Sequence, residues 1–323
     1  MAALLASSYH LLYEPRANNP TGPISQGGSP AQQSRFALFC SNPSSPKLRI
    51  SSLMQPTFDT KKLRRTILDM AYAGCGVHIG CAFSIVEIMA TLYREHLRFP
   101  NGDPAADTRD YLVLSKGHGA MAQYACMREL GWLPNEAFSN YLSDGSALKG
   151  LPDSRLSGIE VDSGSLGHGF SIGVGLAMGA KLSVTDQKTY VIVGDGKNNE
   201  GSIWEGCLFA SHHQLHNFMV IIDENGFQAM GKTNEIIALH SIQSKFESFG
   251  FDTLSIDGHD EVAISHAINQ LQTSASKAPK AIIAKTVKGK GVSFMENNNL
   301  WHYTRLSSDT HAKAIIELSG GPP

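Results

Sequence analysis

The sequence predicts an α/β fold, a doubly wound parallel sheet with helices on both faces. Two short apolar runs, Tyr190–Val193 and Phe218–Ile222, are rich in Val and Ile, as buried strands are. A helix-length segment, Ser202–Leu215, separates these runs, and a right-handed crossover places both strands in one parallel sheet. Strands and helices alternate along most of the chain, which indicates that helices cover both faces of the sheet.

The other elements follow in chain order. A helical period begins near Asp59, and either Asp59 or Thr60 is suited to cap a helix over Lys61–Ala73. A second helix over Ser84–Leu97 is expected to pack on the first. The remaining expected segments are a strand at Tyr111–Ser115, a helix at Ala120–Leu130, a loop-rich stretch over 134–163, a helix at Phe170–Leu182, a helix at Ser241–Phe249, a strand at Phe251–Ile256, a helix at Glu261–Ser274 and a strand at Ala281–Val287.

The first 53 residues differ in composition from the rest of the chain. They are rich in Ser, Pro, Asn, Gly and Gln, and Glu14 is their single acidic residue. Such a segment buries too little apolar surface to offset its ordering entropy, so we predict a disordered, low-complexity extension over 1–53 and one domain over 54–323. Two alternatives remain open. One is an organellar transit peptide, which the Ser content favours and the scarcity of Arg disfavours. The other is a wrongly chosen start site upstream of Met54.

Composition excludes several classes of function. With 323 residues and 42% hydrophobic content the chain can bury a large core, and its net charge of −2 gives no reason to expect a nucleic acid or an anionic membrane as partner. No uninterrupted apolar run reaches the length of a transmembrane helix. The five cysteines form no CxxC pair, which favours a reducing compartment, and we expect a cytoplasmic protein. They are Cys40, Cys75, Cys81, Cys126 and Cys207.

Polar side chains follow the two predicted neighbouring strands. Asp195, within Gly194-Asp-Gly196, comes after the first strand, and Asn225 comes after the second. In open α/β sheets, ligands bind at the carboxyl ends of the strands. A carboxylate and an amide oxygen suit Mg²⁺, which takes its other ligands from water and phosphate, and the flanking glycines let backbone approach a phosphate closely. The sequence therefore predicts a Mg²⁺–diphosphate site, although Asp195 and Asn225 could each also be an ordinary turn residue.

Four motifs in order give the chain a family resemblance. They are Ser115-Lys-Gly-His-Gly119, Gly164-Ser-Leu-Gly-His-Gly169, Gly194-Asp-Gly196 with its distant Asn225, and Lys285-Thr-Val-Lys-Gly-Lys-Gly-Val292. Together they resemble the thiamine-diphosphate-dependent transketolase family over about Thr60 to Asp309. The likeness is only to the N-terminal, pyrophosphate-binding half of a full-length transketolase, a domain of the thiamine-diphosphate-binding fold.

The resemblance implies three sets of site residues. The metal ligands for Mg²⁺ are Asp195, Asn225 and the backbone carbonyl of Phe227. The contacts to thiamine diphosphate are His118, Gly164, Ser165, Leu166, Asp195, Gly196, Asn225 and His302. The catalytic set is His78, which faces the substrate, His118, His302, and Glu200 at a subunit contact that couples two active sites.

The resemblance also implies a function that needs a partner. The chain is expected to be the N-terminal subunit of a two-component transketolase, a transferase that moves a two-carbon ketol unit from a ketose to an aldose. A separate subunit with the pyrimidine-binding domain would complete it, as an α2β2 assembly acting on a sugar or sugar phosphate. One departure concerns the substrate, because Leu151 stands where full-length transketolases carry a histidine in a Gly-His-Pro sequence.

Two alternatives compete with this interpretation. The α-subunit of a 2-oxo-acid dehydrogenase also uses a Gly-Asp-Gly…Asn pattern, although the two His-Gly motifs argue against it. A non-catalytic regulatory subunit that keeps the fold is the other. His78 could instead be a structural histidine, partly buried before an apolar helix with its hydrogen bonds made inside the protein. The residues after His302 depart from the family pattern.

Overall fold

A five-stranded parallel sheet with the order β1-β2-β3-β7-β6 organises the fold. The computed structural model describes residues 56–74 and 77–321. All neighbouring strands in this sheet run parallel, so the predicted fold class is confirmed. The strands are β1 (Tyr111–Leu114), β2 (Thr189–Gly194), β3 (Phe218–Glu224), β6 (Asp252–Asp257) and β7 (Lys280–Lys285).

Side chains of the central strands point alternately to the two faces and fill two separate cores. In β2, Tyr190 and Ile192 join one core, whereas Val191 and Val193 join the other. All four side chains are completely buried. Burial on both faces explains why these strands read as continuous apolar runs and not as an alternation of apolar and polar residues.

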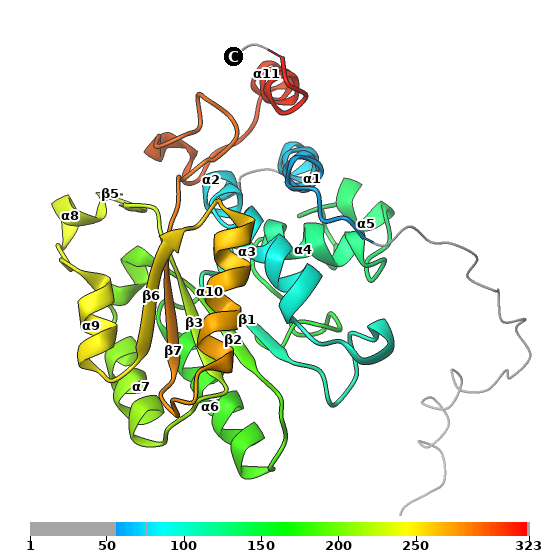
Figure 1. Cartoon of the computed structure of the whole chain (residues 1–323). Helices are drawn as coiled ribbons and strands as arrows, with labels where there is room; N and C mark the ends of the chain where they lie inside the picture. The colour runs from blue at the N-terminus through cyan, green and yellow to red at the C-terminus, as the bar shows by residue number, and fades with distance from the viewer. Residues whose placement is uncertain (1–55, 75–76, 322–323) are drawn as a thin grey trace, which may run out of the picture. The chain divides into compact units, whose positions relative to one another are not determined.

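Helices cover both faces of the sheet. In Figure 1, α7 and α9 lie on one side of the sheet, and α3 and α10 lie on the other. The first core includes residues from α1 (Thr60–Ala73), α2 (Ile79–Phe83), α3 (Val86–Thr91), α4 (Ala120–Glu129) and α10 (Glu261–Thr273). The second core includes residues from α6 (His168–Leu182), α7 (Gly201–His212) and α9 (Ile242–Ser248).

The helix predicted over Ser84–Leu97 is found over Val86–His96, where α3 continues directly into a π-helical turn, whereas α2 before it was not predicted. The helix α2 ends at Phe83, α3 begins at Val86, and the chain continues as a π-helical turn over Leu92–His96. The Ser84 hydroxyl donates to the carboxylate of Asp223, 2.9 Å away in the buried interior, at this break. A tertiary hydrogen bond of this kind fixes Ser84 in a position that helical periodicity cannot reveal.

Several short elements were not predicted from the sequence. The helix α11 (Ser308–Leu318) packs against α1 and begins with a capping box formed by Ser307 and Thr310. Within the stretch expected to be loop-rich lies the single-turn helix α5 (Glu136–Ser139). After β3 come β4 (Phe227–Gln228), β5 (Gly231–Lys232) and α8 (Thr233–Ile236).

The predicted extension over 1–53 lies outside the described residues, as do Cys40 and Cys75, so its character stays a prediction. The cysteines at 81, 126 and 207 are free and buried. Among the helices of residues 56–74 and 77–321, none is long and apolar enough to cross a membrane.

A buried ion pair joins distant segments on the first face. Arg64 of α1 donates to both carboxylate oxygens of Glu87 on α3, at 2.6 and 2.8 Å, and to the backbone carbonyl of Lys290 at 2.8 Å. The Nδ1 of His259 lies 2.9 Å from Glu87, while its Nε2 accepts from the backbone N–H of Val287. Burial by itself raises the pKa of Glu87, but the hydrogen bonds from His259 and Arg64 and the Arg64 charge outweigh it and lower the pKa to about 2.

We expect Glu87→Gln to lower the free energy of unfolding by about 3–5 kcal/mol near neutral pH, because it leaves the Arg64 guanidinium buried without a charged partner. In the native protein the ionised Glu87 contributes stability above its unfolded-state pKa of 4.5, and this contribution is lost as the pH falls toward 2. Urea unfolding at a series of pH values measures both effects, with Glu205→Gln on the exposed side of α7 as control. Equal pH slopes for the Glu87 variant and the native protein would contradict this account.

Candidate active site

A cavity of about 350 Å³ lies at the carboxyl ends of the central strands. The predicted site residues that line it are His78, His118, Gly164, Leu166, Asp195, Gly196, Asn225, Phe227 and His302. Two predicted residues do not line it: Ser165 is exposed, and Glu200 occupies the N-cap position of α7. Residues from six separate stretches of the sequence therefore meet around one space.

The register of the sheet brings Asp195 and Asn225 together. Gly194 at the end of β2 pairs with Asp223 on β3, so the residues that follow each strand leave the sheet side by side. The carboxylate of Asp195 accepts from the backbone N–H of Gly196 at 2.8 Å and from that of Gly226 at 2.6 Å. Gly226 has a φ of 78°, a left-handed conformation that favours glycine after Asn225.

The side chain of Asn225 is fixed at both ends. Its Nδ2 donates to Asp223 at 2.8 Å, and its Oδ1 accepts from the backbone N–H of Phe227 at 3.1 Å. The bond to Asp223 identifies which end of the amide is nitrogen, because a carboxylate can only accept. The amide oxygen of Asn225 is therefore on the side of the Phe227 backbone.

These donor groups fit a hard divalent cation. Asp195 is 2% exposed, and burial together with the nearby charge of Asp223 raises its pKa to about 7. A bound cation would offset both effects and keep the carboxylate ionised. No cluster of three or more His, Cys, Asp or Glu side chains able to hold a metal occurs in the described part of the chain. One carboxylate with amide and carbonyl oxygens suits Mg²⁺ better than Zn²⁺.

The turn after Asp195 also fits a bulky anion. A Cβ at Gly196 would lie 2.7 Å from the Cβ of Gln228, so only glycine permits this packing. The Nε2 of Gln228, a residue of the cavity lining, is a buried donor without a hydrogen-bond partner among the described residues. An unused buried donor beside a turn that only glycine permits is a suitable setting for phosphate oxygens.

A second buried ion pair lies directly beneath the cavity. The ammonium of Lys116 contacts the carboxylate of Asp223, and these side chains are 1% and 0% exposed. Lys116 also donates to the carbonyl of Cys81 at 2.9 Å, while Asp223 accepts from Ser84 and from the hydroxyl of Thr286. Burial by itself raises the pKa of Asp223, but the Lys116 charge and these hydrogen bonds lower it below its usual range. The pair thus joins the ends of β1, β3 and β7 to α2.

Three histidines face one another across the cavity. The ring centroids of His78 and His118 are 5.1 Å apart, and that of His302 lies 5.4 and 5.7 Å from them. Burial and the charges of nearby lysines lower the pKa of His78 to about 4 and that of His302 to about 3, and lower the pKa of His118 well below its ordinary value. All three imidazoles are therefore neutral at physiological pH, able to donate and to accept hydrogen bonds.

One lysine determines the tautomer of His302. The ammonium of Lys288, itself 1% exposed, lies 2.7 Å from the Nδ1 of His302 and 2.7 Å from Asn299 Oδ1. An ammonium can only donate, so Nδ1 accepts and the ring proton is on Nε2. Asn299 in turn donates to the carbonyl of Ala229, which ties the segment carrying His302 to the loop after β3.

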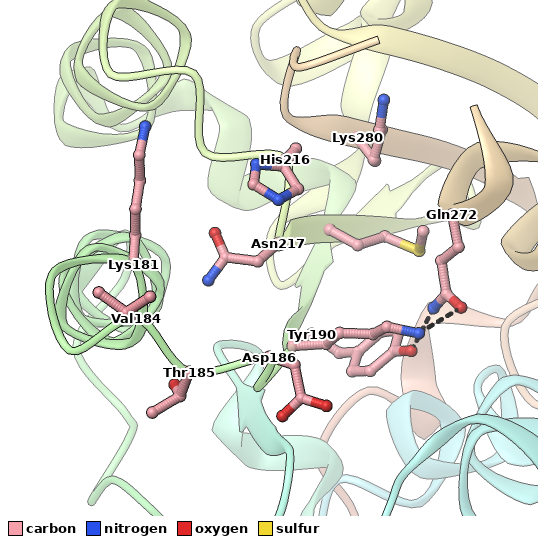
Figure 2. A pocket seen from close by; sticks show the side chains of 11 residues that line it. Lys181, Val184, Thr185, Asp186, Tyr190, His216, Asn217, Gln272 and Lys280 are labelled. Carbon is pink, nitrogen blue, oxygen red and sulfur yellow. Dashed lines mark hydrogen bonds between the residues drawn. The ribbon is translucent and has the colours of Figure 1, made fainter. Parts of the chain in front are cut away.

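A larger cavity, of about 460 Å³, lies at the opposite, amino end of the strands. Figure 2 shows its lining, in which Gln272 contacts Tyr190. Its lysines already have partners in the protein: Lys188 donates to Gln272 at 2.8 Å, and Lys280 to Asp252 at 2.5 Å. The predicted site residues all lie away from this cavity.

Comparison with known proteins identifies the family. The family model described as "Transketolase, thiamine diphosphate binding domain" matches residues 60–319. The chain belongs to the transketolase family. It carries that family's thiamine diphosphate binding domain, which confirms the resemblance seen in the four motifs.

Transketolases of two kinds are similar to this chain. It is 35% identical over 260 residues to one of the subunits of the apulose-4-phosphate transketolase of Phocaeicola vulgatus, covering 80% of this chain and 92% of that protein. It is 36% identical over 254 residues to "6-deoxy-6-sulfo-D-fructose transketolase subunit SqwG" of Clostridium sp., covering 78% and 92%. The crystal structure of transketolase from Campylobacter jejuni matches with a TM-score of 0.76 at 31% identity, covering 84% of this chain but 43% of that one. The chain thus spans less than half of that longer transketolase.

Sequence reasoning assigned no role to several residues that line the cavity. Lys116 lies inside one of the four motifs, Lys197 directly follows another, and Gln228 lies close to Asn225, whereas Cys81 belongs to none of them. The signal for Lys116 was its place directly before Gly117-His118 at the end of β1, where a side chain that points inward must find a buried partner. That its partner would be Asp223, 107 positions away, depends on the strand order.

We expect Asp223→Asn to destabilise the protein by about 3–5 kcal/mol, because it leaves the Lys116 ammonium buried without a counter-charge. The same change removes the carboxylate that orients Asn225, so affinity for Mg²⁺ should fall as well, by roughly 10- to 100-fold. Chemical denaturation and metal titration of the folded fraction measure the two effects separately. Asp257→Asn, at the exposed end of β6, serves as control. A stable variant with native metal affinity would show that the pair does not support the site.

Proposed function

We propose that this chain is the pyrophosphate-binding subunit of a two-component transketolase, which transfers a two-carbon ketol unit from a ketose to an aldose with thiamine diphosphate and Mg²⁺. The observation that carries the proposal is the single cavity in which Asp195, Asn225 and three neutral histidines meet. The names of the similar subunits from Phocaeicola vulgatus and Clostridium sp. support the two-component arrangement.

Within this proposal the residues divide the work by their chemistry. Asp195, the amide oxygen of Asn225 and the carbonyl of Phe227 hold Mg²⁺, and the amide of Gly196 faces the diphosphate. Thiamine diphosphate supplies the carbanion chemistry when bound. The neutral imidazoles of His78 and His302 bind the hydroxyl groups of the sugar and move protons to and from them, for which a base that is uncharged at neutral pH is required.

The substrate is proposed to be a sugar or sugar phosphate. The two subunits named above act, by their names, on sugars that carry a phosphate or a sulfonate. Leu151 lines the cavity and is 43% exposed, and its Cδ1 would lie 2.7 Å from a Cβ at Gly164. An apolar side chain at this place cannot donate to a sugar hydroxyl, which favours a donor that is less hydroxylated or differently shaped there than an ordinary ketose phosphate.

The face built from α6 and α7 is proposed to contact the second subunit. These helices pack against each other, and large apolar side chains remain exposed on them: Ile172 at 41%, Leu208 at 60% and Phe209 at 44%. Leu166, which is 48% exposed, belongs both to the cavity lining and to the turn before α6. A subunit docked on this face would reach the cavity, as an α2β2 assembly with shared active sites requires. Glu200, at the start of α7, is proposed to lie at the same contact.

Reconstitution tests the proposed activity. We expect ketol transfer from a phosphorylated ketose to an aldose only when the chain is combined with a subunit that carries the pyrimidine-binding domain, and only with Mg²⁺ and thiamine diphosphate present. In the same complex Asp195→Asn should weaken Mg²⁺-dependent binding of thiamine diphosphate by about 100-fold or more, because it removes the one carboxylate ligand. Calorimetry and a coupled assay of ketose consumption provide the two measurements.

Three results would contradict the proposal. Ketol transfer by the chain alone would exclude the two-component arrangement. Turnover of pyruvate with an electron acceptor would favour the 2-oxo-acid dehydrogenase alternative. A complex that assembles but binds no thiamine diphosphate would favour a regulatory subunit that keeps only the fold.

We expect Leu208→Asp to weaken assembly with the second subunit by roughly tenfold or more, because it buries a charge at the centre of an apolar contact. Val262→Asp is the matched control, since Val262 is also an exposed helical residue, at 79%, but on α10 at the other face of the sheet. Sedimentation of mixed subunits gives the dissociation constants. If Val262→Asp disrupts assembly and Leu208→Asp does not, the proposed contact face is wrong.

A further inference from the structure

Lys197 is the one lysine of the cavity lining whose ammonium has no hydrogen-bond partner among the described residues. It lies in the short 3₁₀ turn Asp195–Asn199, is 4% exposed, and its Nζ is shielded from solvent. The other buried cations near the cavity are satisfied: Lys116 pairs with Asp223, and Lys288 donates to Asn299 and His302. Lys197 is therefore buried like Lys116 and Lys288, but it lacks the hydrogen-bond partners that these two lysines have.

Burial of an unpaired ammonium is costly. Removing such a charge from water costs several kcal/mol even after the protein relaxes, unless a counter-charge is supplied. Lys116, a second lysine of the same cavity lining, adds its own positive charge to the surroundings of this ammonium. A ligand that brings a counter-charge would relieve this cost.

The protein itself offers Lys197 no free counter-charge among the described residues. The one carboxylate of the described cavity lining is Asp195, which already accepts from two backbone N–H groups and is the proposed metal ligand. Glu200, three residues on, forms no ion pair within 4 Å of Lys197 in the described structure. A ligand bound in this cavity would supply the counter-charge that the described residues do not.

We propose that Lys197 binds the diphosphate of the cofactor, as a cation supplied by the protein in addition to the metal. This inference rests on the proposed function, because it needs an anionic tail in the same cavity. Lys197 directly follows Gly196, which the proposed function places beside that tail, and the two residues belong to one 3₁₀ turn. Its shielded position suits the group that enters the cavity deepest and stays bound, which is the cofactor and not the exchanging sugar.

The proposal makes two predictions of opposite sign for Lys197→Met, which keeps the length of the side chain and removes its charge. Without ligand, the thermal midpoint of the full chain should rise by a few degrees, because a buried unpaired charge has been removed. With ligand, the affinity for Mg²⁺–pyrophosphate and for Mg²⁺–thiamine diphosphate should each fall by roughly 10- to 100-fold, the loss expected for one charged hydrogen bond. Affinity for thiamine, which lacks phosphate, should not change.

The experiment uses the full chain assembled with its second subunit for calorimetric titrations, and the full chain alone for thermal unfolding. Lys277→Met is the matched control, since Lys277 is exposed and distant from the cavity. Lys197→Gln, also uncharged but polar, should show the same loss of affinity and replaces the Met variant if that variant fails to fold.

The outcomes separate this inference from the proposed function. If the native complex does not bind Mg²⁺–thiamine diphosphate, the proposed function fails. If the native complex binds it and the Lys197 variants bind it and pyrophosphate equally well, the proposed function stands and the role of Lys197 is wrong. A third outcome is that the variants keep the native affinity for pyrophosphate but show a raised KM for a phosphorylated donor and not for an unphosphorylated one. This result would assign Lys197 to the anion of the substrate and would likewise overturn the proposal.

Discussion

The buried pair of Lys116 and Asp223 is the interaction on which the site depends. The strands β1 and β3 are not neighbours in the sheet, and the backbone ladder does not require side chains at their ends to meet. Here the Lys116 ammonium at the end of β1 and the Asp223 carboxylate at the end of β3 meet in the interior, together with Ser84 and Thr286. A hydrophobic cluster of the same volume could stabilise the fold equally well. It could not orient the amide of Asn225, which Asp223 does through one hydrogen bond.

The same charges give the cavity its chemical character. Asp223 raises the pKa of Asp195, secondary to burial, so that the site favours a cation beside that carboxylate. Burial and the positive charges of the lysines lower the pKa of His78 and of His302, which keeps both imidazoles neutral. The raised pKa of the Asp195 carboxylate and the neutral histidines of the same cavity lining therefore both follow from one arrangement of buried lysines and acids. Either feature would be lost if these charges were exposed to water, which screens them.

The sequence predicted the parts of this arrangement that obey local rules. The apolar runs of β2 and β3 were evident from composition, and because parallel strands end at one edge, Asp195 and Asn225 were expected together. The network beneath them was not predicted, because a long side chain such as Lys116 can reach many places and periodicity does not specify which. Ser84 illustrates the limit, since its hydroxyl donates to Asp223, 139 positions away, and no local pattern identifies that partner. Glu200 and Ser165 were assigned to the site through resemblance, and they stay predictions.

The charge of the cavity also indicates what the described part of this chain does not supply. Its lining there offers one carboxylate, that of Asp195, and both of its oxygens accept from backbone amides. The neutral histidines can accept and donate protons, but stabilising a protonated nitrogen of the cofactor's pyrimidine ring needs the negative charge of a carboxylic acid side chain. In the proposed two-component enzyme, the second subunit would supply the acid that activates the far end of the cofactor. The exposed Leu166 at the cavity edge, continuous with the apolar face of α6 and α7, is where that chain would enter.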